Sequence, residues 1–299
     1  MARAALQTAY IVSEDLGTSF AERLFTSPRR HSRPDRERNV LLTAREGVVD
    51  VTLRSPRWHG ARVPLATWRW GMGPAVLLVH GWEGRGSQLG AFVAPLVAAG
   101  MSVVTFDAPG HGNSPDHRLY LTDLADCIAD VTASIGPLHG IIAHSFGAAG
   151  VLLAFTRHGI RAPRNVMLAP NVIVEDAVRR FARMVGLDDA DRVALQQRLA
   201  AQSGVSIDAL QLPALVDKRD DDLLIIHDRE DREVGFDHSE ALAAQWPAAQ
   251  LREAYGLGHR RVLRDAAVIG DVVDYVGEGI PLPASDLVRE VDRQLEELP

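Results

Sequence analysis

Three short segments of the chain combine residue types that could carry out nucleophilic chemistry. Residues 143–147 read Ala-His-Ser-Phe-Gly and lie between a short apolar run and a helical pattern, which places Ser145 at a tight turn. His259 stands in the stretch Gly-Leu-Gly-His-Arg, where glycines give the backbone freedom to place the imidazole. Asp228 and Asp231 follow another apolar run. A serine hydroxyl is a poor nucleophile until a base takes its proton, so these residue types together suit nucleophilic catalysis.

The serine segment resembles the nucleophile elbow of the α/β-hydrolase family, whose pattern is G-x-S-x-G, with alanine in place of the first glycine. Small residues are required because the positions two before and two after the serine face neighbouring strands and helices. The resemblance implies that Ser145 is the nucleophile, held in a strained conformation with its hydroxyl exposed above a sheet. It also implies that the N-terminus of the following helix points at the developing oxyanion.

Two further segments resemble loops of the same family. His80, Gly81 and Trp82 follow an apolar strand pattern, as the oxyanion loop does. This implies that the backbone N–H groups of Trp82 and Phe146 bind the oxyanion, and that His80 is structural. Residues 106–114 read Phe-Asp-Ala-Pro-Gly-His-Gly-Asn-Ser and resemble the D-x-P-G-x-G-x-S loop, a tight turn beside the site to which we assign no direct chemistry.

The resemblance also implies the order serine, acid, histidine along the chain. The acid loop of the family reads G-x-x-D-x-x-V, which puts Asp228 at the glycine position, Asp231 at the acid and Val234 at the closing valine. We therefore expect Asp231 to be the orienting acid, with Asp228, a departure from the pattern, as the alternative. His259 follows the last strand pattern and precedes a helix, so we expect it to be the base.

The other imidazole and guanidinium groups near these motifs have plain structural interpretations. Of the eleven histidines, only His259 has both the order and the loop position, and His144 and His227 are expected to be packing or surface groups. Arg261 and Asp265 are four residues apart in a predicted helix, so we expect them to pair, rather than Arg261 to reach an anionic substrate.

Alternating periodicities predict the elements that position these residues. Short apolar runs typical of buried strands occur at 75–80, 102–107, 141–143, 165–169, 223–226 and 250–255. Helical stripes between and after them occur at 89–97, 124–135, 146–158, 239–245 and 262–276. Residues 48–53 and 62–70 alternate with a period of two and predict an antiparallel pair. With the resemblance, we expect an α/β-hydrolase fold: a mostly parallel twisted sheet with helices on both faces.

The chain is expected to divide into four parts. Residues 46–170 and 223–278 form the α/β-hydrolase core. Residues 171–222 are too long for a usual crossover and carry two amphipathic helical patterns, which predicts a small helical lid inserted in a late crossover. Residues 1–45 are expected to form an N-terminal helical extension, a docked helix followed by a solvated, arginine-rich connector, with a binding arm as the alternative. Residues 279–299 are expected to form a C-terminal helical tail.

Composition narrows the classes of partner and cofactor. The 299 residues are 46% hydrophobic and 24% charged, as in ordinary globular proteins, and the net charge of −7 argues against nucleic acid as a partner. The single cysteine, Cys127, permits no intramolecular disulfide and no cysteine-based zinc site. No metal-ligand spacing or phosphate-binding loop is present, so we expect no cofactor. Without a signal-peptide pattern or a membrane-spanning apolar run, we expect a cytoplasmic protein with no membrane partner.

Together these motifs predict a serine hydrolase that cleaves a carboxylic ester, or a related acyl bond, of a small molecule through an acyl-enzyme intermediate. The alternatives are a cofactor-free serine-triad enzyme of another type, namely an acyltransferase, a C–C hydrolase or a haloperoxidase, and a non-catalytic ligand-binding member of the fold. The sequence leaves open the physiological substrate and the oligomeric state, monomer or homodimer.

Overall fold

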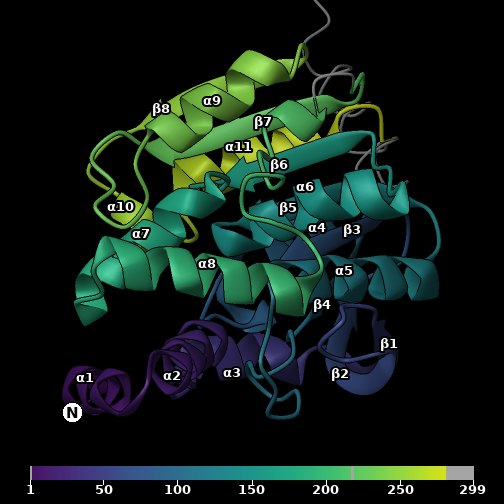
Figure 1. Cartoon of the computed structure of the whole chain (residues 1–299). Helices are drawn as coiled ribbons and strands as arrows, with labels where there is room; N and C mark the ends of the chain where they lie inside the picture. Colours follow the sequence, from purple (N-terminus) through teal and green to yellow (C-terminus); the bar gives the residue numbers. More distant parts are fainter. Residues whose placement is uncertain (1, 217–218, 281–299) are drawn as a thin grey trace, which may run out of the picture.

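A single eight-stranded sheet forms the centre of the protein (Figure 1), in a computed structural model that describes residues 2–216 and 219–280. The strands are β1 (Arg45–Leu53), β2 (Ala61–Trp70), β3 (Ala75–Val79), β4 (Ser102–Phe106), β5 (Leu138–His144), β6 (Arg164–Leu168), β7 (Asp222–Asp228) and β8 (Ala249–Ala254). They lie in the order β1-β2-β4-β3-β5-β6-β7-β8. β1 pairs with β2 in antiparallel fashion, as the alternation predicts, and β2 joins β4 in the same way. The pairings from β4 through β8 are parallel, which confirms the expected sheet.

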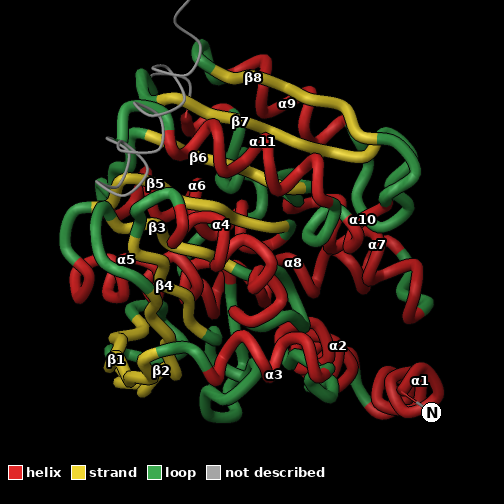
Figure 2. The backbone as a smooth tube through the Cα atoms, turned by 180° about the vertical axis from the view of Figure 1, so that it is seen from behind, coloured by secondary structure: helices red, strands yellow, loops and turns green. Residues whose placement is uncertain are grey.

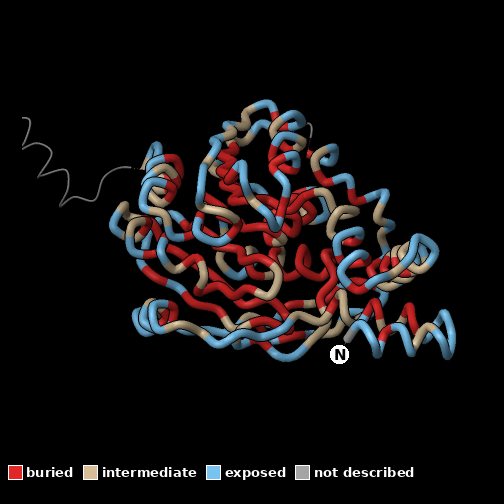
Figure 3. Tube along the Cα trace, turned by 90° about the vertical axis from the view of Figure 1, so that its left-hand side faces the viewer, coloured by how far each residue is buried: buried red, intermediate tan, exposed pale blue. Residues whose placement is uncertain are grey.

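Helices cover both faces of this sheet (Figure 2). One face carries α5 (Leu121–Ile135), α6 (Phe146–His158) and α9 (Asp237–Gln245). The other carries η1 (Gly86–Phe92), α4 (Val93–Ala98) and α11 (Ala266–Gly277). Successive side chains of a strand point to opposite faces, so Leu77 packs in the first apolar cluster and Leu78 in the second. The inner strands are buried along their length (Figure 3), and because both faces are covered they read as continuous apolar runs.

A cap built from two distant parts of the chain lies against the core (Figure 1). Its elements are α1 (Ala2–Val12), α2 (Glu14–Thr26), α7 (Val174–Val185) and α8 (Asp189–Ser203), whereas the short η2 (Ala214–Val216) packs on the core. Leu6 of α1 and Ala21 of α2 share one buried apolar cluster with Phe181 of α7 and Leu195 of α8. The pattern of the insertion predicts α7 and α8, and the structure adds their contact with the first helices of the chain.

The two parts of the cap meet at the buried carboxylate of Glu22 on α2. Arg198 of α8 donates to this carboxylate at 2.8 Å and Arg118 donates at 3.1 Å. The hydroxyl of Tyr120 donates to it as well, and burial together with that hydrogen bond raises the pKa of Tyr120 well above its usual value. Glu22 therefore ties α2 both to α8 and to the loop that precedes α5.

The segment between α2 and α3 (Asp35–Leu42) differs from the expected solvated connector. Residues 27–34 lie against the loop 106–114. Pro28 packs so close to Gly110 that a Cβ there would lie 2.8 Å from the proline ring. The Arg33 side chain is only 17% exposed. Residues 29–32 are exposed, but Arg29, Arg30 and Arg33 also contact carboxylates and carbonyl groups of the core. Local sequence could not show this, because those partners are 50 or more residues away.

The region after His259 also departs from the expected continuous helix. It divides into α10 (Gly258–Arg261) and α11, which begins at Ala266. The Asp265 carboxylate accepts hydrogen bonds from the N–H groups of Ala267 at 3.0 Å and Val268 at 3.1 Å and so caps α11. Arg261 donates to the Leu257 carbonyl at 2.9 Å, so the predicted pairing of Arg261 with Asp265 is wrong.

Of the predicted C-terminal tail, residues 281–299 lie outside the described residues. Within the ranges 2–216 and 219–280, none of the helices combines the length and the apolar character that crossing a bilayer requires.

Candidate active site

Ser145 stands at the turn from β5 into α6 in a left-handed conformation, with φ 53° and ψ −120°. A side chain in such a conformation costs on the order of 1–3 kcal/mol, so its surroundings must hold it. The Ser145 N–H donates to the Leu168 carbonyl at 3.0 Å, and the Asn171 N–H donates to the Ser145 carbonyl at 3.1 Å. A Cβ at Gly147 would lie 2.5 Å from the His80 carbonyl oxygen, which is why this position needs glycine. The turn is thus wedged between the ends of β3 and β6.

The imidazole of His259 lies between the hydroxyl of Ser145 and the carboxylate of Asp231. Its Nε2 is 2.9 Å from Ser145 Oγ, and its Nδ1 is 2.7 Å from Asp231 Oδ2. The three residues follow β5, β7 and β8, so the carboxyl ends of parallel strands bring them to one edge of the sheet. The three residues that the motifs single out are therefore adjacent, in the order that proton transfer needs.

Asp231 is held in its ionised form. Burial alone would favour the neutral acid, but hydrogen bonds from His227 and His259, and backbone N–H groups, hold the pKa of Asp231 well below its usual range. Its second oxygen accepts the N–H groups of Glu233 at 2.7 Å and Val234 at 3.1 Å. An ionised carboxylate beside Nδ1 fixes the N–H there and leaves Nε2 as the acceptor that faces the serine.

His227 is a partner of Asp231 that the sequence analysis missed. Its Nε2 lies 3.2 Å from the same Oδ2 atom that contacts His259, and its Nδ1 lies 2.7 Å from Ser239 Oγ. The side chain is fully buried at the end of β7. The available signal was its position four residues before Asp231, but loop geometry decides whether such residues meet.

Asp228, the alternative acid, points to the backbone of the histidine loop. Its Oδ2 accepts the N–H groups of Gly258 at 2.7 Å and of Leu257, and its Oδ1 accepts the N–H of Glu230 at 2.7 Å. The carboxylate that stands where the family has glycine thus ties the loop after β7 to the loop that carries His259.

Two buried histidines, His144 and His80, hydrogen-bond to the backbone of loops around the site. His144 Nε2 lies 2.9 Å from the carbonyl oxygen of His259, and burial lowers the pKa of His144 to about 3, so the neutral ring donates there. His80 Nε2 accepts the N–H of Ala108 at 3.0 Å, and burial lowers the pKa of His80 to about 4. Both rings brace loops, in keeping with the packing roles expected for them.

The backbone N–H groups of Trp82 and Phe146, which the sequence predicts as oxyanion donors, have no acceptor among the described residues. Phe146 is the first residue of α6, and Trp82 follows β3 in the adjacent loop, with the two rings 5.6 Å apart in an edge-to-face arrangement. Unpaired donors at a helix N-terminus are suited to bind a developing oxyanion.

A group of side chains elsewhere contains residue types that bind metals, but its histidine has no free lone pair for a metal ion. In the described part of the chain, ligand atoms of Asp176, Asp237 and His238 lie within 4.8 Å of one another. His238 Nδ1 accepts the N–H groups of Val172 at 3.0 Å and Ile173 at 3.2 Å, so the neutral ring carries its proton on Nε2. That nitrogen faces Asp176 at 3.6 Å and has no lone pair to offer a metal.

The family profile described as the alpha/beta hydrolase family matches residues 76–271. That range is well over half of the chain and includes the elbow, the acid loop and the histidine loop. The chain therefore belongs to the alpha/beta hydrolase family.

Individual relatives agree with this family and differ in chemistry. A non-heme chloroperoxidase, CPO-A1, of Kitasatospora aureofaciens is 30% identical over 105 residues, which cover 33% of this chain and 37% of that protein. The structure of Rv0554 from Mycobacterium tuberculosis matches with a TM-score of 0.61 at 18% identity over 77% of this chain and 98% of that one. The esterase EaEST from Exiguobacterium antarcticum matches with a TM-score of 0.56 at 15% identity, over 76% and 98%. At such identities the structural matches show the shared fold alone.

Proposed function

We propose that this alpha/beta hydrolase is a serine hydrolase that cleaves a carboxylic ester, or a related acyl bond, of a small molecule. The observation that carries the proposal is the continuous chain of hydrogen bonds from Ser145 Oγ through His259 to Asp231, at 2.9 and 2.7 Å. This arrangement supplies a nucleophile, a base and an orienting acid.

In the proposed first step, Ser145 Oγ attacks the substrate carbonyl carbon while His259 Nε2 takes the hydroxyl proton. Asp231 keeps the Nδ1 proton in place and stabilises the imidazolium that forms. The imidazolium then gives its proton to the leaving alcohol, and an ester between Ser145 and the acyl group remains.

The backbone N–H groups of Trp82 and Phe146 are proposed to bind the negative oxygen of the tetrahedral intermediate. Within residues 2–216 and 219–280 neither donor has an acceptor, which supports this role. One such donor contributes about 3–4 kcal/mol to lowering the barrier. In the second step, His259 takes a proton from water, the hydroxide attacks the acyl carbon, and Ser145 leaves with its proton restored.

The proposal is tested by turnover of p-nitrophenyl esters of increasing acyl length and by labelling with a fluorophosphonate. The wild type should hydrolyse at least one ester and become labelled, and Ser145→Ala should lose both at an unchanged melting temperature. Ser134→Ala, at the far end of α5, is the matched control and should behave as the wild type. Labelling of Ser145→Ala would place the nucleophile elsewhere.

A second candidate is a cofactor-free haloperoxidase with the same serine triad, favoured by the partial match to the non-heme chloroperoxidase of Kitasatospora aureofaciens. Halogenation of a diketone with bromide, hydrogen peroxide and acetate distinguishes the two. A haloperoxidase would give halogenation at a rate comparable to ester turnover, and the esterase that we favour would not.

We further propose a small-molecule substrate, a cytoplasmic setting, and no nucleic-acid or membrane partner. The buried, unpaired thiol of Cys127 and the net charge of −7 support these proposals. Light scattering at two concentrations separates a monomer from a homodimer.

A further inference from the structure

The loop 81–86 carries Trp82 but has little regular structure of its own. Glu83, the residue after Trp82, has a left-handed backbone with φ 54°, which is unfavourable for a side chain with a Cβ. The Glu83 N–H donates to His111 Nε2 at 3.1 Å. An N–H group that binds an oxyanion must be held in place before the reaction, so this strained loop needs outside support.

One support comes from Arg29, just after α2. Its guanidinium binds both carboxylate oxygens of Glu83, with Nε at 2.8 Å and a terminal nitrogen at 3.1 Å, and its backbone N–H donates to the same group at 3.2 Å. His31 lies 3.4 Å from that carboxylate. Burial opposes ionisation of Glu83, but the contacts with Arg29 lower its pKa, so the pair is charged. The N-terminal segment therefore holds the Glu83 carboxylate in place through these bonds.

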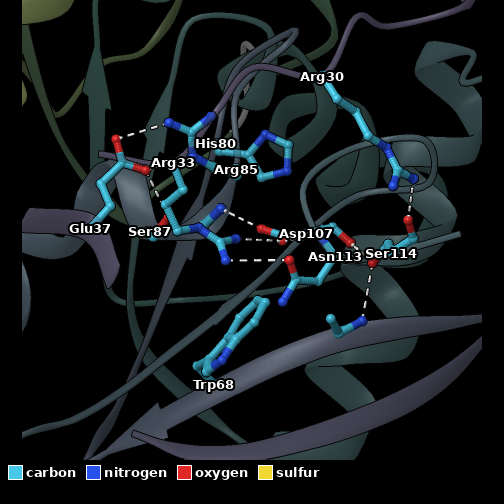
Figure 4. A network of polar contacts seen from close by, with 12 residues as sticks. Arg30, Arg33, Glu37, Trp68, His80, Arg85, Ser87, Asp107, Asn113 and Ser114 are labelled. Atoms are coloured by element: carbon cyan, nitrogen blue, oxygen red, sulfur yellow. Dashed lines mark hydrogen bonds and ion pairs between the residues drawn. The ribbon is translucent and has the colours of Figure 1, made fainter. Parts of the chain in front are cut away.

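A second support lies two residues further along the loop, where Arg85 and Glu37 form a buried pair (Figure 4). Arg85 Nε is 2.6 Å from Glu37, and both side chains are only 6% exposed. Ser87 donates to Glu37 at 2.8 Å, and Arg85 donates to the carbonyl groups of His31 and Ser32, each at 3.3 Å. This fully bonded buried pair joins the loop to α3.

Asp107 completes the support. Its carboxylate accepts the N–H of Gly86 at 2.7 Å, the N–H of Asn113 at 2.7 Å and the guanidinium of Arg33 at 3.4 Å (Figure 4). Arg33 also lies over the ring of Trp68, 5.8 Å from its centroid. The same N-terminal segment thus binds Glu83 and Arg85 directly and reaches Gly86 through Asp107, so all three contacts lie on the C-terminal side of Trp82.

We propose that residues 29–37 form a clamp that positions the Trp82 N–H for oxyanion binding, with Arg29 and Glu37 as positioning residues. The inference rests on the proposed function, because it assigns the clamp to a donor of that reaction. The family profile begins at residue 76, so the clamp lies outside the matched range. By holding the Trp82 N–H in place, the clamp would stabilise the oxyanion of the transition state. Within the described residues it makes no hydrogen bond or ion pair with the proton-transfer groups Ser145, His259 and Asp231.

Arg29→Ala is the first test, because the Arg29 side chain is 79% exposed and its loss leaves the fold intact. We expect kcat to fall about 10-fold with KM unchanged, less than the about 10²–10³-fold loss on removing an oxyanion donor outright. The pH at half-maximal kcat/KM should not move. The matched control is Arg62→Ala, which breaks a similarly exposed pair with Asp50 and should leave kcat unchanged.

Glu37→Gln is the second test, and the melting temperature reports any loss of fold. In the folded fraction, counted by fluorophosphonate end-point labelling, kcat should fall more than in Arg29→Ala. Glu83→Gln should match Arg29→Ala, and the double variant should be no worse than either single one, because both changes remove the same contact.

Each outcome decides between the proposals. An active, labelled wild type with unchanged kcat in Arg29→Ala and in Glu37→Gln would overturn the clamp and leave the proposed function standing. A rise in KM alone, or additive losses in the double variant, would also overturn it. A wild type without turnover or labelling would overturn the proposed function and the clamp with it.

Discussion

Asp228 and Asp231 are three residues apart, yet their carboxylates contact different parts of the site. Asp231 contacts the imidazole of His259, whereas Asp228 accepts N–H groups from the backbone that carries this histidine. The first is suited to stabilise a charge that appears during the reaction, and the second to hold a loop in every state. Their substitutions should therefore differ strongly in kinetic effect.

Asp231→Asn should lower kcat by about 10³–10⁴-fold, because the amide can stabilise neither the tautomer nor the imidazolium. Asp228→Asn should lower it by about 10-fold or less, since an amide oxygen still accepts one of the N–H groups. Steady-state kinetics on the best ester, with melting temperatures as the control for folding, measures both. A larger loss in Asp228→Asn would reverse our assignment of the acid.

At this scale, motif spacing predicted which residues meet but not what completes their contacts. The structure brings Ser145, Asp231 and His259 together as expected, and their catalytic roles stay a prediction until the variants are measured. The contact of His227 with Asp231, and of Asp228 with Gly258, depends on how two loops meet in space. The spacing of residues along the chain does not show which residues of two different loops will be in contact.

Among the elements, the cap is the part that the sequence predicted least completely. The periodicity of 171–222 predicted the helices α7 and α8, because an amphipathic stripe is a local signal. It could not predict that α1 and α2 bury the same stripe, because their partners lie more than 150 residues away. The first apolar residues of the chain, such as Leu6, are buried for this reason.

Glu22→Ala should lower the free energy of unfolding by about 3 kcal/mol, because Arg198 and Arg118 then lack the buried carboxylate that pairs them. Urea denaturation followed by circular dichroism measures this change. The control is Glu175→Ala, which breaks an exposed pair with Arg179 on α7 and should cost about 0.5 kcal/mol or less. Equal losses in the two variants would contradict the central role of Glu22.

Over the whole molecule, buried neutral histidines set the dependence of stability on pH. Burial lowers the pKa of His80 to about 4 and the pKa values of His111 and His144 to about 3, against about 6.5 in the unfolded chain. Between these values the unfolded chain binds protons that the native state does not, so stability falls as the pH falls from about 6.5. Burial raises the pKa of Asp107 and Asp123, which offsets part of the loss.

The free energy of unfolding should therefore be about 2–4 kcal/mol lower at pH 5 than at pH 7, as three histidines outweigh two carboxyl groups. Urea denaturation at both pH values, at one ionic strength, measures the difference. His111→Asn should make the difference smaller, whereas His59→Asn, which replaces an exposed histidine, should not change it. A midpoint that is the same at pH 5 and pH 7 for the wild type would contradict this account.

The position of His259 after β8 has a consequence for the newly made protein. In the described part of the chain β8 is the edge strand and pairs only with β7, and His259 lies 114 residues after Ser145. Translation adds about 5–20 residues per second, so Ser145 emerges several seconds before the imidazole that is proposed to activate it. Under the proposed function, the nascent chain therefore lacks the base for acylation of Ser145 by cellular esters until the final edge of the sheet has closed.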